Sequence, residues 1–170
     1  MRHLRSRKKR ACLMSIFVLA VLALFLLRIP ILSISNGDRQ LMFYARRGET
    51  MQISSFHSLY HVTQTETWTL LEPGNLRLDQ MYFGCYEAGE YYSTYFMERY
   101  KPFSGAGDYY LEVGDLYQPS ILLVITPTSQ FRIQLGDRVH LIYQEIHGFS
   151  TFRYERIPLW QFISYQLFRQ

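Results

Sequence analysis

The stretch that decides the fold runs from His61 to Phe83 and reads HVTQTETWTLLEPGNLRLDQMYF. In its first half, threonines occupy one side, and the other side includes the apolar residues Val62, Trp68 and Leu70; such a period of two is typical of a β-strand with one buried face. Pro73-Gly74-Asn75 is a turn signal, and Leu76 to Phe83 continues as a second strand. The stretch therefore predicts an antiparallel hairpin.

Short strand-like segments occupy most of the chain on both sides of this hairpin. Phe131–Leu135 and Val139–Tyr143 flank Gly136-Asp137, which predicts a second hairpin. Ile121–Ile125 is a continuous apolar run, as expected of a central strand. About eight strands without intervening helices predict a mostly β fold, an antiparallel β-sandwich or a partly open barrel. The further strand candidates are Leu41–Ala45, Thr50–Phe56, Glu90–Met97 and Asp108–Val113.

The last residues follow a different pattern. Ile157, Trp160, Ile163 and Leu167 recur at helical spacing, and Pro158 suits the first turn of a helix. We therefore expect a short C-terminal helix over residues 158–169. Packing on the sheet is the favoured position for it, and the alternative is a position on the membrane surface.

The distribution of charge excludes a nucleic-acid-binding surface, although the chain is basic overall. Of its 18 lysines and arginines, seven lie within the first 28 residues, and no acidic residue precedes Asp38. Residues 36–170 carry 11 basic and 14 acidic side chains, which gives a net charge of −3. A basic stripe for phosphate contacts is therefore not expected, and no nucleic-acid partner is predicted.

The basic residues belong to a targeting segment. Residues 1–10 form a basic tail, and Ala11–Leu27 contains no charge. After Arg28, the apolar run resumes to Ile34, so residues 11–34 predict a transmembrane anchor with its N-terminus in the cytoplasm. Removal as a signal peptide at the weak Ser33-Ile34-Ser35 site is the alternative, which would leave a secreted protein. Either way, we expect residues 36–170 to form an extracytoplasmic β domain.

No catalytic, metal or cofactor motif is recognisable in the chain. Signatures of hydrolases, zinc proteases, nucleotide-binding loops and paired cysteines are missing. Cys85 is the sole cysteine of residues 36–170 and is expected to be a small buried hydrophobe. His57 and His61 are four residues apart, which in a strand separates them by about 13 Å, so they predict no shared metal ion.

One group of polar residues nonetheless stands out. His57-Ser58 is followed by Glu66, and a histidine and a glutamate brought together across a turn suit a general-base site. Ser58 is a poor triad partner for His57, because neighbouring strand residues point to opposite faces. The alternative is a polar cluster that fixes the turn and has no role in catalysis.

Three motifs together suggest a family. A strand ends in His57-Ser58, and Glu66 follows nine positions after the histidine with Trp68 close behind. An aromatic-rich segment ending in Ala-Gly covers residues 83–89, and a Gly-Asp turn within residues 135–141 joins two strands. These motifs resemble DUF1850, a bacterial family (domain of unknown function 1850) of short exported or anchored β-rich proteins. The chain departs from its pattern at Cys85, where the family has Ser.

The resemblance implies a partner and extends the candidate site. Members of the family often occur beside tripartite ATP-independent periplasmic (TRAP) transporters of the TAXI type, which implies an accessory role in solute uptake. The family motif adds the 83–89 turn to the polar residues, and tyrosines rim the resulting site. The candidate ligand-binding residues are His57, Ser58, Glu66, Tyr86 and Gly89.

The leading hypothesis is an extracytoplasmic, membrane-anchored binding or accessory module. It would assist a TRAP/TAXI-type transporter or another envelope protein and would bind a small-molecule ligand without a cofactor. One alternative is an exported hydrolase-like enzyme that uses His57 and Glu66. Another is a structural envelope protein that self-associates through exposed sheet edges.

Overall fold

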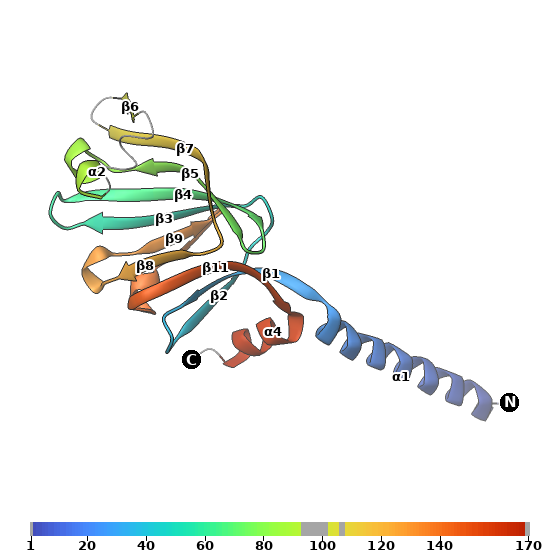
Figure 1. The fold of residues 1–170 in the computed structure, drawn as a ribbon. Helices are drawn as coiled ribbons and strands as arrows, with labels where there is room; N and C mark the ends of the chain where they lie inside the picture. Colours follow the sequence, from blue (N-terminus) through green and yellow to red (C-terminus); the bar gives the residue numbers. More distant parts are fainter. Residues whose placement is uncertain (1, 93–101, 106–107, 169–170) are drawn as a thin grey trace. The chain divides into compact units, whose positions relative to one another are not determined.

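The computed structural model describes residues 2–92, 102–105 and 108–168 (Figure 1). These residues form two compact units, one that spans Pro30–Glu155 and one that combines the two chain ends, up to Ile29 and from Arg156 onward. The protein is mostly β, with two antiparallel sheets and a short C-terminal helix, as the sequence predicts.

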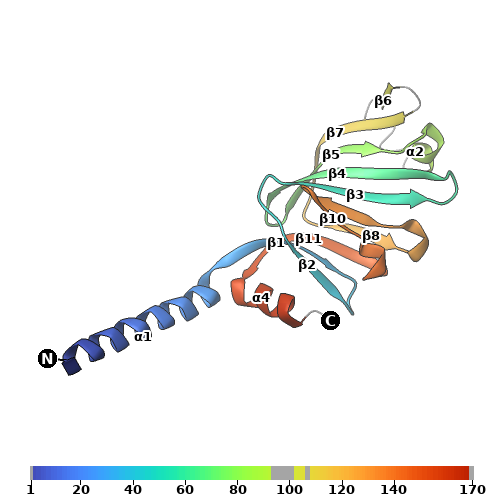
Figure 2. The same ribbon diagram turned by 180° about the vertical axis from the view of Figure 1, so that it is seen from behind.

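The larger sheet is built around the predicted hairpin. Strands β4 and β5 pair across Pro73-Gly74, and β9 and β10 pair across Gly136-Asp137, so both predicted turns join antiparallel strands. The return strand expected over Val139–Tyr143 is shorter, because it ends at His140 and a single-turn helix follows. The strand order is β10-β9-β3-β4-β5-β7-β6, which can be followed from both sides in Figures 1 and 2. The strands are β3 (Thr50–His57), β4 (Val62–Glu72), β5 (Asn75–Tyr82), β6 (Pro102–Gly105), β7 (Asp108–Gln118), β9 (Arg132–Leu135) and β10 (Arg138–His140).

The smaller sheet has the order β2-β1-β11-β8 and contains two strands that the sequence did not suggest. Residues 28–34 were expected to end the anchor, but they form β1, because Pro30 cannot continue a helix and the isoleucines around it favour strands. Strand β11 was missed altogether. Ile121–Ile125 forms an edge strand, so its expected central position is wrong. The strands are β1 (Arg28–Ser35), β2 (Gln40–Tyr44), β8 (Ile121–Ile125) and β11 (Gly148–Pro158).

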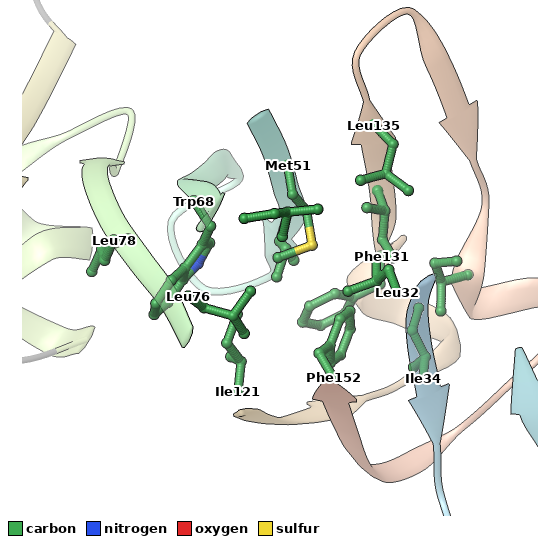
Figure 3. Close-up of a cluster of buried hydrophobic side chains, with 14 of the residues drawn as sticks. Leu32, Ile34, Met51, Trp68, Leu76, Leu78, Ile121, Phe131, Leu135 and Phe152 are labelled. Carbon is green, nitrogen blue, oxygen red and sulfur yellow. The ribbon is translucent and has the colours of Figure 1, made fainter. Parts of the chain in front are cut away.

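One hydrophobic core joins the two sheets (Figure 3). On the larger sheet, Met51 lies between Trp68 and Leu135, its register partners on the neighbouring strands. The smaller sheet contributes Leu32 of β1 and Phe152 of β11, and both side chains are fully buried. Because the core takes side chains from both sheets, neither sheet can keep its apolar face out of water alone.

A short helix replaces part of a predicted strand. The expected strand Glu90–Met97 begins inside α2 (Tyr86–Tyr92), and its residues 93–97 lie outside the described part of the chain. Gly84, with φ of 73°, ends the extended backbone before α2. Glu87 lies in the first turn of α2, where a negative charge is favoured. Two single-turn helices, η1 (Pro127–Ser129) and η2 (Ile142–Gln144), connect later strands.

The chain ends form the second unit, which contains α1 (Arg2–Leu26) and α4 (Leu159–Phe168). The Leu159 backbone N–H donates a hydrogen bond of 2.8 Å to the Leu27 carbonyl oxygen. The predicted C-terminal helix is confirmed, and none of its described residues is buried. Within the described residues, no helix combines the length and the apolar character needed to cross a membrane.

Candidate functional site

The core-facing side of the β3–β4 pair changes from apolar to polar along its length. Register pairs bring Met51 opposite Trp68, then Ile53 opposite Glu66, then Ser55 opposite Gln64, and finally His57 opposite Val62. All these residues share one face, because alternate positions of paired strands point to the same side. The row therefore runs from the hydrophobic core to a polar end at the β3–β4 turn.

A cavity of about 210 Å³ opens beside the middle of this row. It lies between the β3–β4–β5 face and the edge strand β8, so both sheets contribute to its wall. Its wall contains a carboxylate, a carboxamide, hydroxyl groups and apolar side chains. The lining residues are Ile53, Ser55, Gln64, Thr65, Glu66, Met81, Tyr82, Phe83, Leu122, Leu123, Val124 and Phe131.

Glu66 supplies the charged group of the cavity. Its register partners on the two neighbouring strands are Ile53 and Met81, both buried, so the carboxylate lies among apolar side chains. The Trp68 indole N–H donates a hydrogen bond of 2.9 Å to Glu66 Oε2. A hydrogen bond to a charged acceptor is stronger than a neutral one, and this bond fixes the orientation of the carboxylate.

Gln64 supplies the carboxamide, and its side chain is 8% exposed. Its Nε2 is a buried donor that has no hydrogen-bond partner among the described residues. Leaving such a donor unpaired costs about 1–3 kcal/mol, so native proteins rarely keep one without a reason. The terminal torsion of a glutamine side chain is soft, so the amide reorients easily toward a group that enters the cavity.

His57 and Ser58 lie at the turn end of β3, outside the lining of this cavity. His57 Nδ1 accepts a hydrogen bond of 3.4 Å from the Tyr60 backbone N–H, and the two rings are 5.0 Å apart. The ladder places His57 four residues from Ile53, the partner of Glu66, which separates the His57 and Glu66 backbones by about 13 Å. The fold therefore positions Glu66, and not His57, at the cavity.

Tyr86 and Gly89 belong to α2 and likewise do not line the cavity. The Tyr86 hydroxyl donates a hydrogen bond of 2.6 Å to Glu90 Oε1, one helical turn later. This bond to a carboxylate raises the pKa of Tyr86 above its ordinary value. Gly89 is buried within the helix, and the glycine with a positive φ in this segment is Gly84.

Gln64 was missed in the sequence, although a signal for it exists. Val62, Trp68 and Leu70 mark the apolar side of β4, and Gln64 and Glu66 occupy the same side between them. Two polar residues in succession on a core-facing side are unusual and mark a place where the core is interrupted. The contribution of β8 and Phe131 to the cavity carries no comparable signal.

Metal ligation and known relatives give no further assignment. Among the described residues, no group of three or more His, Cys, Asp or Glu side chains is arranged to hold a metal ion. Cys85 is half-buried and packs against the core.

No family model, no curated protein and no solved structure matches this chain, so the resemblance to DUF1850 stays a prediction.

Proposed function

We propose that this chain is a membrane-anchored module outside the cytoplasm that binds a small molecule in the Glu66 cavity. We take the two sheets as the halves of a β-sandwich that is open at the β8 edge. The observation that carries the proposal is the presence of a carboxylate and an unpaired buried amide in one cavity wall. A closed structural core is destabilised by such groups, whereas a binding site uses them.

The wall favours a ligand with a donor group, an acceptor group and a small apolar body. Glu66 suits an ammonium or another N–H donor, and the Gln64 amide suits an oxygen acceptor. Ile53, Met81 and Phe131 offer apolar contacts. The volume of about 210 Å³ is below the roughly 300–1,000 Å³ of pockets for drug-sized ligands, so the ligand is small. Short aliphatic amines and small apolar amino acids fit these requirements.

Glu66→Gln is expected to weaken ligand binding by at least about tenfold, because hydrogen bonds to a charged group contribute about 1.5–3 kcal/mol. The change keeps the size of the side chain and an acceptor for the Trp68 indole. The measurement is isothermal titration of the detergent-solubilised full chain with amines and amino acids, after a thermal-shift screen. Glu72→Gln is the matched control, since Glu72 is exposed and paired with Arg47. Equal affinities for both variants would contradict the assignment.

Gln64→Met is expected to separate stability from binding. Methionine keeps the unbranched shape but removes the unpaired donor, so the free energy of unfolding should rise by about 1 kcal/mol. Ligand affinity should fall at the same time, because the donor to the ligand is lost. Urea unfolding and titration of the same sample measure both quantities. A fall in stability would identify Gln64 as a fold determinant and would argue against a binding role.

Three observations support membrane attachment through α1. Ala11–Leu27 is an uncharged stretch of 17 residues, and six basic residues precede it. The large apolar side chains from Leu13 to Leu27 are mostly exposed and do not contribute to the core. At 1.5 Å per residue the stretch measures about 25 Å, at the short end for a bilayer. Lysine and arginine side chains that reach to the interface compensate for such a shortfall.

Retention of the segment is supported by the position of β1. Cleavage near Ser33-Ile34-Ser35 would cut this strand, in which Ile31, Leu32 and Ile34 are fully buried. A protein cut there would lose a strand that lies between β2 and β11. An uncut chain with its N-terminus in the cytoplasm is therefore the form that we propose.

The proposed partner is a solute transporter in the same membrane, of the TRAP/TAXI type that the resemblance implies. A tagged full chain, purified in mild detergent from its native cells, should recover a permease subunit. A chain with α1 replaced by an unrelated single-span anchor tests whether the β unit itself makes the contact. Recovery of chaperones alone with both chains would count against an accessory role.

The hydrolase hypothesis receives less support. Acid–base chemistry by His57 and Glu66 needs the two side chains within hydrogen-bond reach of one substrate atom, directly or through a water. The ladder instead separates their backbones by about 13 Å, and Glu66 is oriented by Trp68. The geometry therefore favours binding over catalysis at Glu66.

A further inference from the structure

Helix α4 is uncharged and largely apolar, and five of its ten residues are exposed among the residues that the structure describes. Its ten residues, LWQFISYQLF, contain no acidic or basic side chain, and none of them is buried. Leu167 and Phe168 at its end are 72% and 80% exposed. A soluble helix normally covers its apolar side against a core, so this composition indicates another apolar environment.

Three of the exposed apolar residues of α4 form one line along the helix. Trp160, Ile163 and Leu167 are spaced by three and four residues, which places them on one face. All three are exposed. Gln161 directly follows Trp160 in the sequence, which places it off this line. We call Trp160, Ile163 and Leu167 the α4 stripe.

Contacts within the unit of the chain ends tie the start of α4 to the end of α1. The Leu159 N–H donates to the Leu27 carbonyl, and the rings of Phe25 and Trp160 are 5.9 Å apart. Leu27 is the last residue of the apolar stretch that we assign to the membrane. If α1 leaves the bilayer at Leu27, α4 must begin at the same depth, because these contacts allow no large offset.

We propose that α4 lies in the lipid–water interface on the extracytoplasmic side of the membrane, and that the side chains of the α4 stripe insert among the lipids. The inference rests on the proposed anchor α1 and adds a second membrane contact at the other chain end. Tryptophan prefers this interface, where an apolar ring and a polar N–H find matching surroundings, and the α4 stripe contains the exposed Trp160. The absence of charge in α4 makes apolar insertion the source of binding, so zwitterionic lipid suffices.

A second membrane contact has a consequence for the β unit. Helix α1 leads directly into β1, and β11 leads directly into α4. Since β1 and β11 are neighbouring strands of the smaller sheet, the domain is attached to the bilayer through both.

Trp160 is a natural probe of the environment of α4, because the only other tryptophan, Trp68, is buried in the β core. The full chain is reconstituted into phosphatidylcholine vesicles, with or without bromine near the headgroup end of the acyl chains. The fluorescence of Trp160 is obtained by subtracting the emission of the Trp160→Phe variant from the emission of the native chain. We expect bromine near the headgroup end of the acyl chains to quench most of this emission. Acrylamide dissolved in the water should have little effect on it.

Flotation of the same vesicles distinguishes the failure of this inference from that of the anchor. A chain that does not float with the vesicles overturns the anchor and the α4 inference with it. A chain that floats, but whose Trp160 is quenched by acrylamide and not by bromine, overturns the α4 inference alone. Emission shielded from both quenchers also overturns it, because a protein surface would then cover the stripe.

Two charge substitutions add a matched comparison. Ile163→Glu places a carboxylate in the α4 stripe and should abolish most of the quenching by brominated lipid, since a charge is costly in the bilayer. Gln161→Glu places the same charge off the stripe and should leave the quenching unchanged. Equal effects of the two variants would contradict the proposed orientation of the helix.

Discussion

We expect that a chain beginning at residue 36 does not fold, whereas a chain beginning at Arg28 does. The difference between them is β1, in which Ile31, Leu32 and Ile34 are fully buried. Removing one large aliphatic side chain from a core costs about 2–5 kcal/mol, so losing three costs as much as the entire stability of a typical domain, about 5–15 kcal/mol.

The loss of β1 also removes hydrogen-bonding partners. Strand β1 lies between β2 and β11, so its absence leaves both strands without a neighbour on that side. The Ser33 hydroxyl, buried within β1, donates to the Glu155 carboxylate. Soluble yield, circular dichroism and urea unfolding of the two chains measure the effect. A cooperative transition at the same urea concentration for both would refute this role of β1 and would revive signal cleavage near Ser35.

Gly84→Ala is expected to reduce the free energy of unfolding by about 2–5 kcal/mol. Gly84 has a φ of 73°, where an alanine is strained by about 1–2 kcal/mol. An added Cβ would also lie 2.8 Å from Val62 Cβ and 3.3 Å from the Thr63 carbonyl oxygen. Overpacking of this kind costs a further 1–3 kcal/mol or so, since the backbone itself must move.

Gly114→Ala is the matched control for Gly84→Ala. Gly114 has nearly the same φ, 69°, but an added Cβ there meets no atom within 4 Å. In the control, the free energy of unfolding should therefore fall only by the cost of placing an alanine at a positive φ, about 1–2 kcal/mol. Urea unfolding of the three proteins gives the difference, which measures how closely residues 83–85 approach β4. Identical losses in the two variants would show that no close approach exists.

The local elements of the fold were predictable because their signals are local. Pro73-Gly74 and Gly136-Asp137 restrict the backbone to tight turns, and alternating side chains on both sides assign the strands that they join. The C-terminal helix followed from the spacing of its apolar residues and from Pro158 at its start. The α2 helix was not predicted, because its tyrosines favour strands in general, whereas the positive φ of Gly84 interrupts the extended backbone there.

The candidate site was only partly predictable. Glu66 was recognised from the sequence and does line the cavity, but His57, Ser58, Tyr86 and Gly89 lie elsewhere. The grouping with His57 treated a short distance along the sequence as a short distance in space. In a β ladder, however, each residue adds about 3.3 Å, so a separation of four residues already exceeds the reach of a hydrogen bond.

By itself, the sequence determined the basic apolar start of the chain, the β class and the two hairpins, because composition, alternation and turn residues act over a few neighbours. Tertiary structure alone decided that β1 and β11, joined through Ser33 and Glu155 across 122 positions, form the middle of the smaller sheet. It also decided that Glu66 and Gln64 face β8 across a cavity. The physical reason is that packing between distant segments depends on how both sheets fill one core, which no short pattern encodes.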